Sequence, residues 1–425
     1  MTAWSNWSGS VSSTPARIEK PRNEAELAGL VRAANKVRVV GAGHSFMPLC
    51  ETDGTLLNLG EMEGEVTVNA DATRATAPAG WSLAKLTQIL WDKGASLINQ
   101  GDVNPQALAG AIGTGTHGTG ATLGSLSTAA RAFELMMADG SIVKCSATEN
   151  ADLFQAARLS LGLMGVATKI EFDVLPAYHL EERLEVYPLA EIAERWDEWA
   201  AANRHIEFFV FPYADLAMLK ILHPKPSEGP MKEQKDMDDT AFRRVCDLCR
   251  TFPFLTGYLQ RRLLPKEMKR RRVGPAYRIF PSERTVKFEE MEYELPRANG
   301  WPALREVIGW IRKKNLPVAF PFEFRLVAAD DIWLSPFQGR LGASISMHQY
   351  HRMAWREIFA EGEKIFRAHD GRPHWAKRHT LTAGDVHKLY PDAAKFCAVR
   401  DKVDPGAKFA NAHLTQLFGI ESRKP

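Results

Sequence analysis

The chain has 425 residues, of which 45% are hydrophobic and 25% charged, and its 54 basic side chains nearly balance its 51 acidic ones. This length favours two domains with a large buried core. The balanced charge gives no general case for nucleic-acid binding, and no apolar run is long enough to span a membrane.

The five cysteines are scattered along the chain, and the N-terminus shows neither the basic nor the apolar region of a secretory signal. This pattern predicts reduced thiols and a cytoplasmic protein. Cys246 and Cys249 have CxxC spacing, but no second ligand pair lies near them. We therefore expect two half-buried thiols one helical turn apart and no metal.

The first 176 residues alternate short strand and helix patterns. Residues 25–35 have helical periodicity, and residues 37–40 are typical of a short buried strand. A hairpin is expected over 65–80, a helix over 82–94 that ends at Gly94, and two strands on either side of Asp139–Gly140. Residues 151–176 predict a helix, a glycine break and a final strand. The pattern predicts an α+β fold rather than repeating βαβ units.

The pattern of predicted elements changes after Tyr178. Residues 189–203 predict a helix, and residues 206–222 form a strong β run. Strands are expected over 287–296, 317–329 and 341–351, followed by a helix over 355–369. The basic run Arg261 to Arg272, with its interleaved leucines, predicts a solvated helix face, and the alternative is contact with an acidic partner or an anionic membrane surface.

Two glycine-rich loops are the first candidates for binding chemistry. In "VVGAGHSF", Phe46 stands where a dinucleotide fingerprint needs its third glycine, and no helix pattern follows. The loop "GTGTHG" fits GxGxxG but also leads into no helix. Neither is therefore a Rossmann turn. Backbone N–H groups in such loops still form anion-binding concavities, so the pair could hold one pyrophosphate from two sides.

Several stretches together resemble a known family. "VVGAGHSF", "NQGDVNPQALAGAIGTGTHGTG", "MEYELP", "FEFR", "RPHWAKRH" and "DPGAKFANAHL" are similar to the sugar-lactone and alditol oxidoreductases of the vanillyl-alcohol oxidase flavoprotein superfamily. The likeness covers nearly the whole chain, and it is nearest to the bacterial L-gulono-1,4-lactone dehydrogenases and D-arabinono-1,4-lactone oxidases. It implies an FAD-binding domain over 1–176, a substrate (cap) domain over 177–372, and a C-terminal segment, 373–425, that returns to the FAD domain.

The resemblance also implies a set of FAD-binding residues. His44 matches the histidine that carries FAD covalently in many members, and the alternative is that it only lines the pocket. The loops would hold the pyrophosphate and ring, and a later stretch would lie near the adenine. The full set is Val40, Gly41, Ala42, Gly43, His44, Ser45, Gly101, Asp102, Gly110, Thr114, Gly115, His117, Gly118, Thr119, Gly165, Val166 and Ile170. Asn411 and His413 would lie near the flavin or the site.

Glu323 and Arg325 are the expected catalytic pair, because strand alternation puts both on one face. Glu323 would accept the proton of the substrate carbinol, and Arg325 would stabilise negative charge on the flavin. An isolated pair of this kind would more often be an exposed ion pair. His348 and Lys377 match two further active-site positions of the family, for proton transfer or for binding substrate oxygens.

The implied reaction is oxidation of an aldono-1,4-lactone, L-gulono- or D-arabinono-1,4-lactone, at its 2-hydroxyl by hydride transfer to flavin N5. Oxygen or another electron acceptor would reoxidise the flavin. One alternative is a polyol (alditol) oxidase, but Ala107 falls where alditol oxidase has a substrate-contacting serine, which favours the lactone. Another is a binding protein with this fold and no catalysis.

Overall fold

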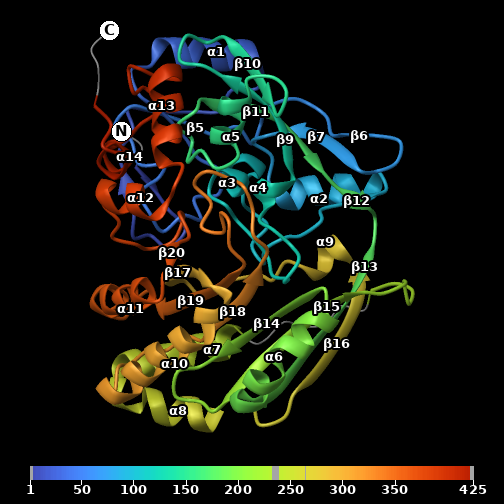
Figure 1. The fold of residues 1–425 in the computed structure, drawn as a ribbon, viewed down its shortest axis with the longest axis vertical. Coiled ribbons are helices and arrows are strands. Elements are labelled where there is room, and N and C mark those ends of the chain that lie inside the picture. The colour runs from blue at the N-terminus through green and yellow to red at the C-terminus, as the bar shows by residue number, and fades with distance from the viewer. Residues whose placement is uncertain (1–2, 232–238, 264, 422–425) are drawn as a thin grey trace.

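The computed structural model describes residues 3–231, 239–263 and 265–421, shown as ribbons in Figure 1. Small sheets and short helices make up the part before residue 177, and one large sheet dominates the part after it. This mixture of helices with mainly antiparallel sheets confirms the predicted α+β class.

A three-stranded parallel sheet carries the first glycine loop. Its central strand is β5 (Thr55–Leu57), flanked by β3 (Arg17–Glu19) and β4 (Val37–Val39). Helix α1 (Glu24–Ala33) starts where the Asn23 side chain accepts a hydrogen bond from the helix backbone, and it buries its apolar face on this sheet. Strand β4 leads directly into the glycine loop without a following helix, as the sequence predicted.

A five-stranded antiparallel sheet forms most of the remaining N-terminal part. Its order is β10-β9-β11-β7-β6, and both predicted hairpins, β6–β7 and β9–β10, are present. Two separate two-stranded sheets accompany it. The bounds are β6 (Thr67–Val68), β7 (Arg74–Pro78), β9 (Ala130–Met136), β10 (Ile142–Ser146), β11 (Val166–Asp173), and the pairs β1 (Trp4–Ser5) with β2 (Ser12–Ser13) and β8 (Ala95–Ser96) with β12 (Leu175–Pro176).

Four helices pack around this sheet and enclose the largest apolar cluster of the described chain. They are α2 (Leu83–Asp92), α3 (Leu108–Gly113), α4 (Leu126–Ala129) and α5 (Ala151–Ala157). The predicted helix end at Gly94 is confirmed, since this glycine has the positive φ of +78° that a side chain would oppose. The second glycine loop begins at the end of the short helix α3.

The large sheet has eight strands in the order β16-β13-β15-β14-β18-β19-β17-β20, and every neighbouring pair is antiparallel. The predicted β run over 206–222 is two strands with a turn between them. The bounds are β13 (His179–Pro188), β14 (His205–Val210), β15 (Leu216–Pro224), β16 (Lys269–Pro275), β17 (Phe288–Pro296), β18 (Phe322–Val327), β19 (Gly342–Tyr350) and β20 (Arg372–Pro373).

The two faces of this sheet differ in chemistry. Apolar side chains of one face pack under α6 (Leu189–Ala202), α10 (Arg297–Lys314) and α11 (Arg356–Ala368). The alternating residues on the opposite face include buried carboxylates and cations. In Figure 1 the sheet lies below the N-terminal part, so the strands β17, β18 and β19 end near the loops above them.

The basic run 261–272 is not one helix, which corrects the sequence expectation. Helix α7 (Asp239–Thr251) leads through η1 (Pro253–Leu255) into α8 (Thr256–Leu263), and Leu264 lies outside the described residues. The run then continues as the edge strand β16, paired with β13, and the short helix α9 (Ala276–Ile279) follows. Pairing with β13 overrides the helical propensity of the Lys, Arg and Leu residues.

The C-terminal helices return to the N-terminal part. In Figure 1 these helices, drawn in red, lie beside the first residues of the chain, drawn in blue. Apolar residues of α12 (Ala383–Leu389), α13 (Ala393–Val403) and α14 (Ala412–Phe418) join the same cluster as α2, α3 and α5. The division at residues 176 and 372 stays a prediction. Within the described ranges, no helix has the length and apolar character of a membrane span.

Candidate functional site

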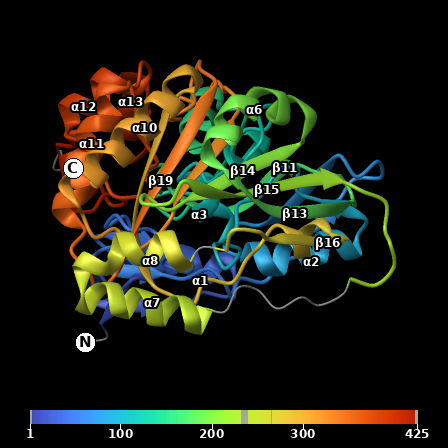
Figure 2. The ribbon, with the colours of Figure 1, turned by 90° about the horizontal axis from the view of Figure 1, so that it is seen from below.

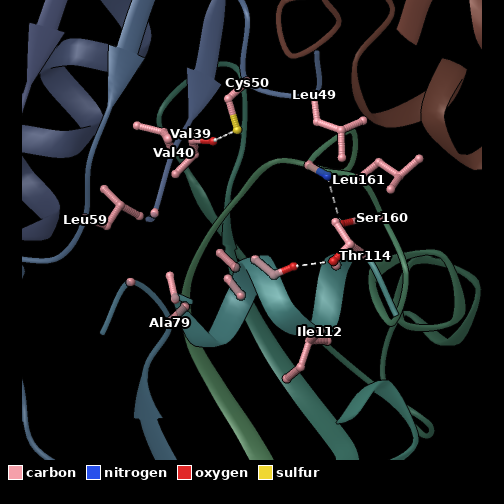
Figure 3. Close-up of a pocket in the computed structure, with 18 of the residues that line it drawn as sticks. Val39, Val40, Leu49, Cys50, Leu59, Ala79, Ile112, Thr114, Ser160 and Leu161 are labelled. Atoms are coloured by element: carbon pink, nitrogen blue, oxygen red, sulfur yellow. Dashed lines mark hydrogen bonds between the residues drawn. The ribbon is translucent and has the colours of Figure 1, made fainter. Parts of the chain in front are cut away.

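Two adjoining cavities share part of their lining: the first lies within the N-terminal part, and the second lies between that part and the charged face of the large sheet. The first, here called the glycine-lined cavity, occupies about 1210 Å³ including its open mouth. Figure 3 shows it between β4, α3 and the loop around Leu161. Ten of the residues predicted to bind the cofactor line it: Val40, Gly41, Ala42, Gly43, His44, Ser45, Gly110, Thr114, Gly165 and Val166.

Glycine is required where the walls of this cavity meet. A Cβ on Gly41 would lie 2.8 Å from the Cβ of Ala107, and a Cβ on Gly80 would lie 2.4 Å from the carbonyl oxygen of Leu59. Such distances are too short for real side chains, so the loops approach each other only because these positions lack one. Gly43 has φ +67°, which also favours glycine.

The backbone of the first loop is free to bind an anion. Among the described residues, none accepts a hydrogen bond from the amide groups of residues 41–45. Consecutive unpaired N–H groups beside a cavity form a site for phosphate oxygens. The apolar walls farther in, from Leu59, Leu135 and Leu161, suit the flat rings of a dinucleotide. The residues present therefore fit an FAD-sized cofactor.

Arg38 holds this cavity together, and sequence reasoning missed it. Its buried guanidinium donates to the carbonyl oxygens of Leu49 and Leu161, both at 2.8 Å, and to that of Phe409. It thus ties β4 to the 161–162 loop and to the C-terminal segment. Burial lowers the pKa of Arg38. A lone arginine in the strand "VRVV" carries no local signal for this role.

The other predicted cofactor residues lie outside the glycine-lined cavity. Gly101, Asp102 and His117 line the second cavity, and Gly115, Gly118, Thr119 and Ile170 line neither. Thr119 donates its hydroxyl to the carbonyl of Ile206, and Ile170 is fully buried in the apolar cluster. Their roles in cofactor binding stay predictions.

His44 stands where the two cavities meet, together with Gln106 and Ala376. Its ring stacks on that of Trp7, with a centroid distance of 5.0 Å. Burial, reinforced by the charge of Lys377, lowers the pKa of His44 to about 4. The imidazole is therefore neutral at physiological pH, with a free electron pair.

The second cavity, here called the charged cavity, contains Glu323 and Arg325 of β18. Strand alternation puts Phe322 and Phe324 into the apolar core and the two charged side chains on the opposite face, as predicted. Oε2 of Glu323 lies 3.5 Å from Nη2 of Arg325. Only 5% of Glu323 and 8% of Arg325 is exposed, so this is not a surface ion pair.

Burial sets the electrostatics of this pair. It raises the pKa of Glu323, although the charge of Arg325 opposes the shift. Burial alone would lower the pKa of Arg325, but the negative charges of Glu323 and Glu292 outweigh it and raise that pKa. Within the described chain, Oε1 of Glu323 has no hydrogen-bond partner, so one carboxylate oxygen is available to a ligand.

Three glutamates of β17 alternate onto the charged face of the sheet, two of them, Glu290 and Glu292, lining the charged cavity, and sequence reasoning assigned them no role. Glu292 accepts hydrogen bonds from Arg325 at 2.9 Å and from Ser344 at 2.7 Å. Glu294 lies 3.2 Å from Nε2 of His117. Burial would lower the pKa of His117, but these two carboxylates raise it to about 10, which makes this histidine a buried cation. The signal was the alternation of glutamates in "FEEMEYELP".

The third glutamate, Glu290, links the other two predicted catalytic residues. It accepts a hydrogen bond from the ammonium of Lys377, and its Oε1 lies 3.3 Å from Nε2 of His348. The carbonyl of Pro321 lies 3.0 Å from the second ring nitrogen of His348. Burial would raise the pKa of Glu290, but Lys377 and His348 outweigh it and lower that pKa.

A further charged group forms the wall around Asp102. Lys220 lies 3.1 Å from Asp102 and 2.9 Å from Glu207, and Arg284 lies 2.8 Å from Asp102. Burial raises the pKa of Glu207 to about 7, in spite of Lys220. The structure thus brings Asp102 to the charged cavity, where it is surrounded by cations.

Two weaker expectations concern the C-terminal segment. Asn411 starts helix α14 and donates to the carbonyl groups of Pro48 and Glu51, so it fastens the segment beside the first glycine loop. The ring of His413 is tilted by 43° against that of His379, with centroids 6.3 Å apart. Neither lines the two cavities.

Comparisons with known proteins agree with this arrangement. Residues 15–146 match the FAD binding domain family, and residues 170–417 match the D-arabinono-1,4-lactone oxidase family. L-gulono-1,4-lactone dehydrogenase of Mycobacterium tuberculosis is 37% identical over 98% of this chain and 99% of its own. Bovine (Bos taurus) L-gulonolactone oxidase is 31% identical over 95% and 94%, and a Streptomyces alditol oxidase 29% identical over 98% and 99%.

Among solved structures, a cholesterol oxidase of Brevibacterium sterolicum superposes with a TM-score of 0.81 over 98% of this chain and 96% of its own, at 15% identity. That likeness shows the shared fold. The FAD-binding match covers the first glycine loop, and the second match covers β18, β17 and Lys377. The chain therefore belongs to the D-arabinono-1,4-lactone oxidase family of FAD-dependent sugar-lactone oxidoreductases.

Proposed function

We propose that this FAD-dependent oxidoreductase oxidises the 2-hydroxyl of an aldono-1,4-lactone, L-gulono- or D-arabinono-1,4-lactone, to the 2-keto lactone. The observation that carries the proposal is the buried pair Glu323 and Arg325 in a cavity that joins the glycine-lined cavity at His44. The names of the relatives point to the same substrate class. When bound, FAD supplies the acceptor for the hydride.

Glu323 takes the proton of the substrate hydroxyl. Its partnerless Oε1 is an open acceptor, and a pKa raised by burial makes it a stronger base than an exposed glutamate. Arg325 keeps its charge throughout and balances the negative charge that develops during oxidation. Glu292 of β17 holds the Arg325 guanidinium in place from the same face of the sheet.

Lys377 and His348 bind the other substrate oxygens. Both contact Glu290, so they act as one hydrogen-bonded group in the wall of the charged cavity. A sugar lactone has no net charge but many hydroxyl groups, which pair equally well with carboxylates and with cations. A cavity lined by both signs therefore favours such a molecule over an anionic substrate.

His44 would hold FAD covalently through the flavin 8α carbon, with its ring nitrogen in place of a hydrogen there; the two electrons released would pass through the flavin to its electron acceptor. Support comes from its place at the junction of the cavities and from its lowered pKa, which leaves the ring nitrogen free to react. Acid precipitation tests the bond, because covalently bound flavin stays with the protein pellet. Release of all flavin into the supernatant would show that His44 only lines the pocket.

A turnover comparison tests the substrate. L-gulono-, L-galactono- and D-arabinono-1,4-lactone are offered beside xylitol, and oxygen consumption is followed in parallel with dye reduction. We expect the lactones to be preferred, because the chain is 37% identical to an L-gulono-1,4-lactone dehydrogenase and 29% identical to an alditol oxidase. Ala107 lines only the glycine-lined cavity, so it contributes nothing to the wall of the charged cavity. Preference for xylitol would support alditol oxidation, and no turnover of any would support a binding protein. The free thiols further support a cytoplasmic site for the reaction.

A further inference from the structure

The segment from Leu248 to Leu263 exposes an unusual amount of apolar surface. Seven large apolar side chains in the described residues are exposed, and five of them lie in this short segment. Phe254 is 71% exposed, the largest value of the seven. The five are Leu248, Phe252, Phe254, Tyr258 and Leu263, and we call them the α7–α8 patch. Clustered apolar exposure of this kind marks an interaction surface.

The charges around the patch have one sign. Between residues 240 and 263, every exposed charged side chain is an arginine: Arg243, Arg244, Arg250, Arg261 and Arg262. The acidic Asp247 is half-buried and accepts a hydrogen bond from Tyr350. None of the five arginines has a carboxylate within ion-pair distance in the described part of the chain. The patch is thus apolar with an unneutralised basic surround.

Two basic residues in the second half of the run predicted from the sequence form ion pairs with glutamates. Arg271 of β16 pairs with Glu181 and Glu228, and Arg272 pairs with Glu182. The alternative considered from the sequence, a contact through 261–272, therefore moves toward the N-terminus, onto α7, η1 and α8. Figure 2 shows α7 and α8 side by side at one edge of the molecule.

The opposite side of these helices is firmly packed. Cys246 and Cys249 are buried against Phe288 and Phe320, and the amide of Gln260 donates to the carbonyl of Val318 at 2.6 Å. The helices therefore present a fixed outer surface. Phe288 and Phe320 also line the charged cavity, so α7 separates a partner bound to the patch from this cavity.

We propose that the α7–α8 patch docks this protein on the surface of a membrane that contains anionic lipids. Aromatic and leucine side chains enter the boundary between headgroups and acyl chains, while arginines bind anionic headgroups. Five exposed arginines, with only the half-buried Asp247 among them, fit a surface of uniform negative charge. A protein partner would need acidic residues at matching places and apolar cover for side chains that project as far as Phe254.

Vesicle flotation tests the docking. The purified flavoprotein is mixed with vesicles of phosphatidylcholine alone or with one third phosphatidylglycerol, at low and at high salt. We expect flotation with the anionic vesicles, and a loss of roughly tenfold or more in binding at high salt because the arginine contribution is screened. The double variant Phe252→Ser, Phe254→Ser should lose flotation and keep its turnover of lactone with a soluble dye.

Leu341 provides a matched control, since it is 50% exposed but lies outside the patch. It directly precedes β19, and the contact of this strand with α7 is made at the other end, by Tyr350. Leu341→Ser should float like the unaltered protein. Equal flotation of the double variant would overturn the proposal, as would failure of the unaltered protein to float. Self-association that depends on the patch, without vesicle binding, would assign the surface to a second copy instead and would also overturn it.

Discussion

Replacing Glu323 by glutamine isolates the proton-accepting step. The change keeps the shape of the side chain but removes its negative charge and most of its basicity. Arg325 retains Glu292 as a partner at 2.9 Å, so no buried charge is left alone. The fold and the glycine-lined cavity should therefore be preserved, and the purified variant should contain as much flavin as the unaltered protein.

The expected effect on rate is large. A positioned general base contributes about 10²- to 10⁴-fold to such a reaction, so the rate of flavin reduction by lactone should fall by that factor. Burial has raised the pKa of Glu323, which makes its contribution greater than that of an exposed glutamate. Rapid mixing under anaerobic conditions, followed by the loss of the visible flavin band, measures this step without interference from the electron acceptor.

Glu363→Gln is the matched control. Glu363 is equally buried in the same part of the chain, but it accepts hydrogen bonds from Tyr293 and Thr380 and lines neither cavity. A glutamine oxygen can accept both bonds, so flavin reduction should proceed at the unaltered rate. If Glu323→Gln reduces its flavin as fast as Glu363→Gln does, Glu323 is not the base.

Three further changes test other parts of the site. His44→Ala should release its flavin on acid precipitation, and flavin that stays in the pellet would place the bond elsewhere. Activity should be lost as pH falls through the pKa of Glu323, which burial raises above the ordinary 4.5. Arg325→Gln removes the charge that opposes this shift, so the acidic limb of the kcat/KM profile should move to higher pH. An acidic limb that does not move would contradict the coupling between the two side chains. Gly41→Val should lose most bound flavin, measured by absorbance, because its Cβ would lie 2.8 Å from Ala107; full flavin content would show that the loop gives way.

Local patterns in the sequence predicted a large part of the site. The two-residue period of a strand was sufficient to put Glu323 and Arg325 on one face. The glycines of the first loop predicted backbone N–H groups open to an anion, and in the described part of the chain the amides of residues 41–45 have no acceptor. Hairpins and single helices were also predictable, because their contacts are between residues near in sequence.

The remainder depends on pairings between distant segments. Strand β14 pairs with β18 so that Glu207 lies opposite Arg325, and Asp102 meets Lys220 from another part of the chain. No local pattern contains such a register. The basic run 261–272 was wrongly expected to be helical because its helical propensity is local. The pairing of its second half with β13 joins segments far apart in the sequence, so no local pattern shows it.

Anaerobic addition of lactone to the purified protein tests the central claim most directly. The account predicts a yellow protein whose visible flavin band bleaches with L-gulono- or D-arabinono-1,4-lactone, with a 2-keto lactone as the product by mass spectrometry. The same band should persist with lactone in the Glu323→Gln protein over the time that bleaches the unaltered one. A flavin that stays oxidised with every lactone, or that bleaches with xylitol alone, would contradict it.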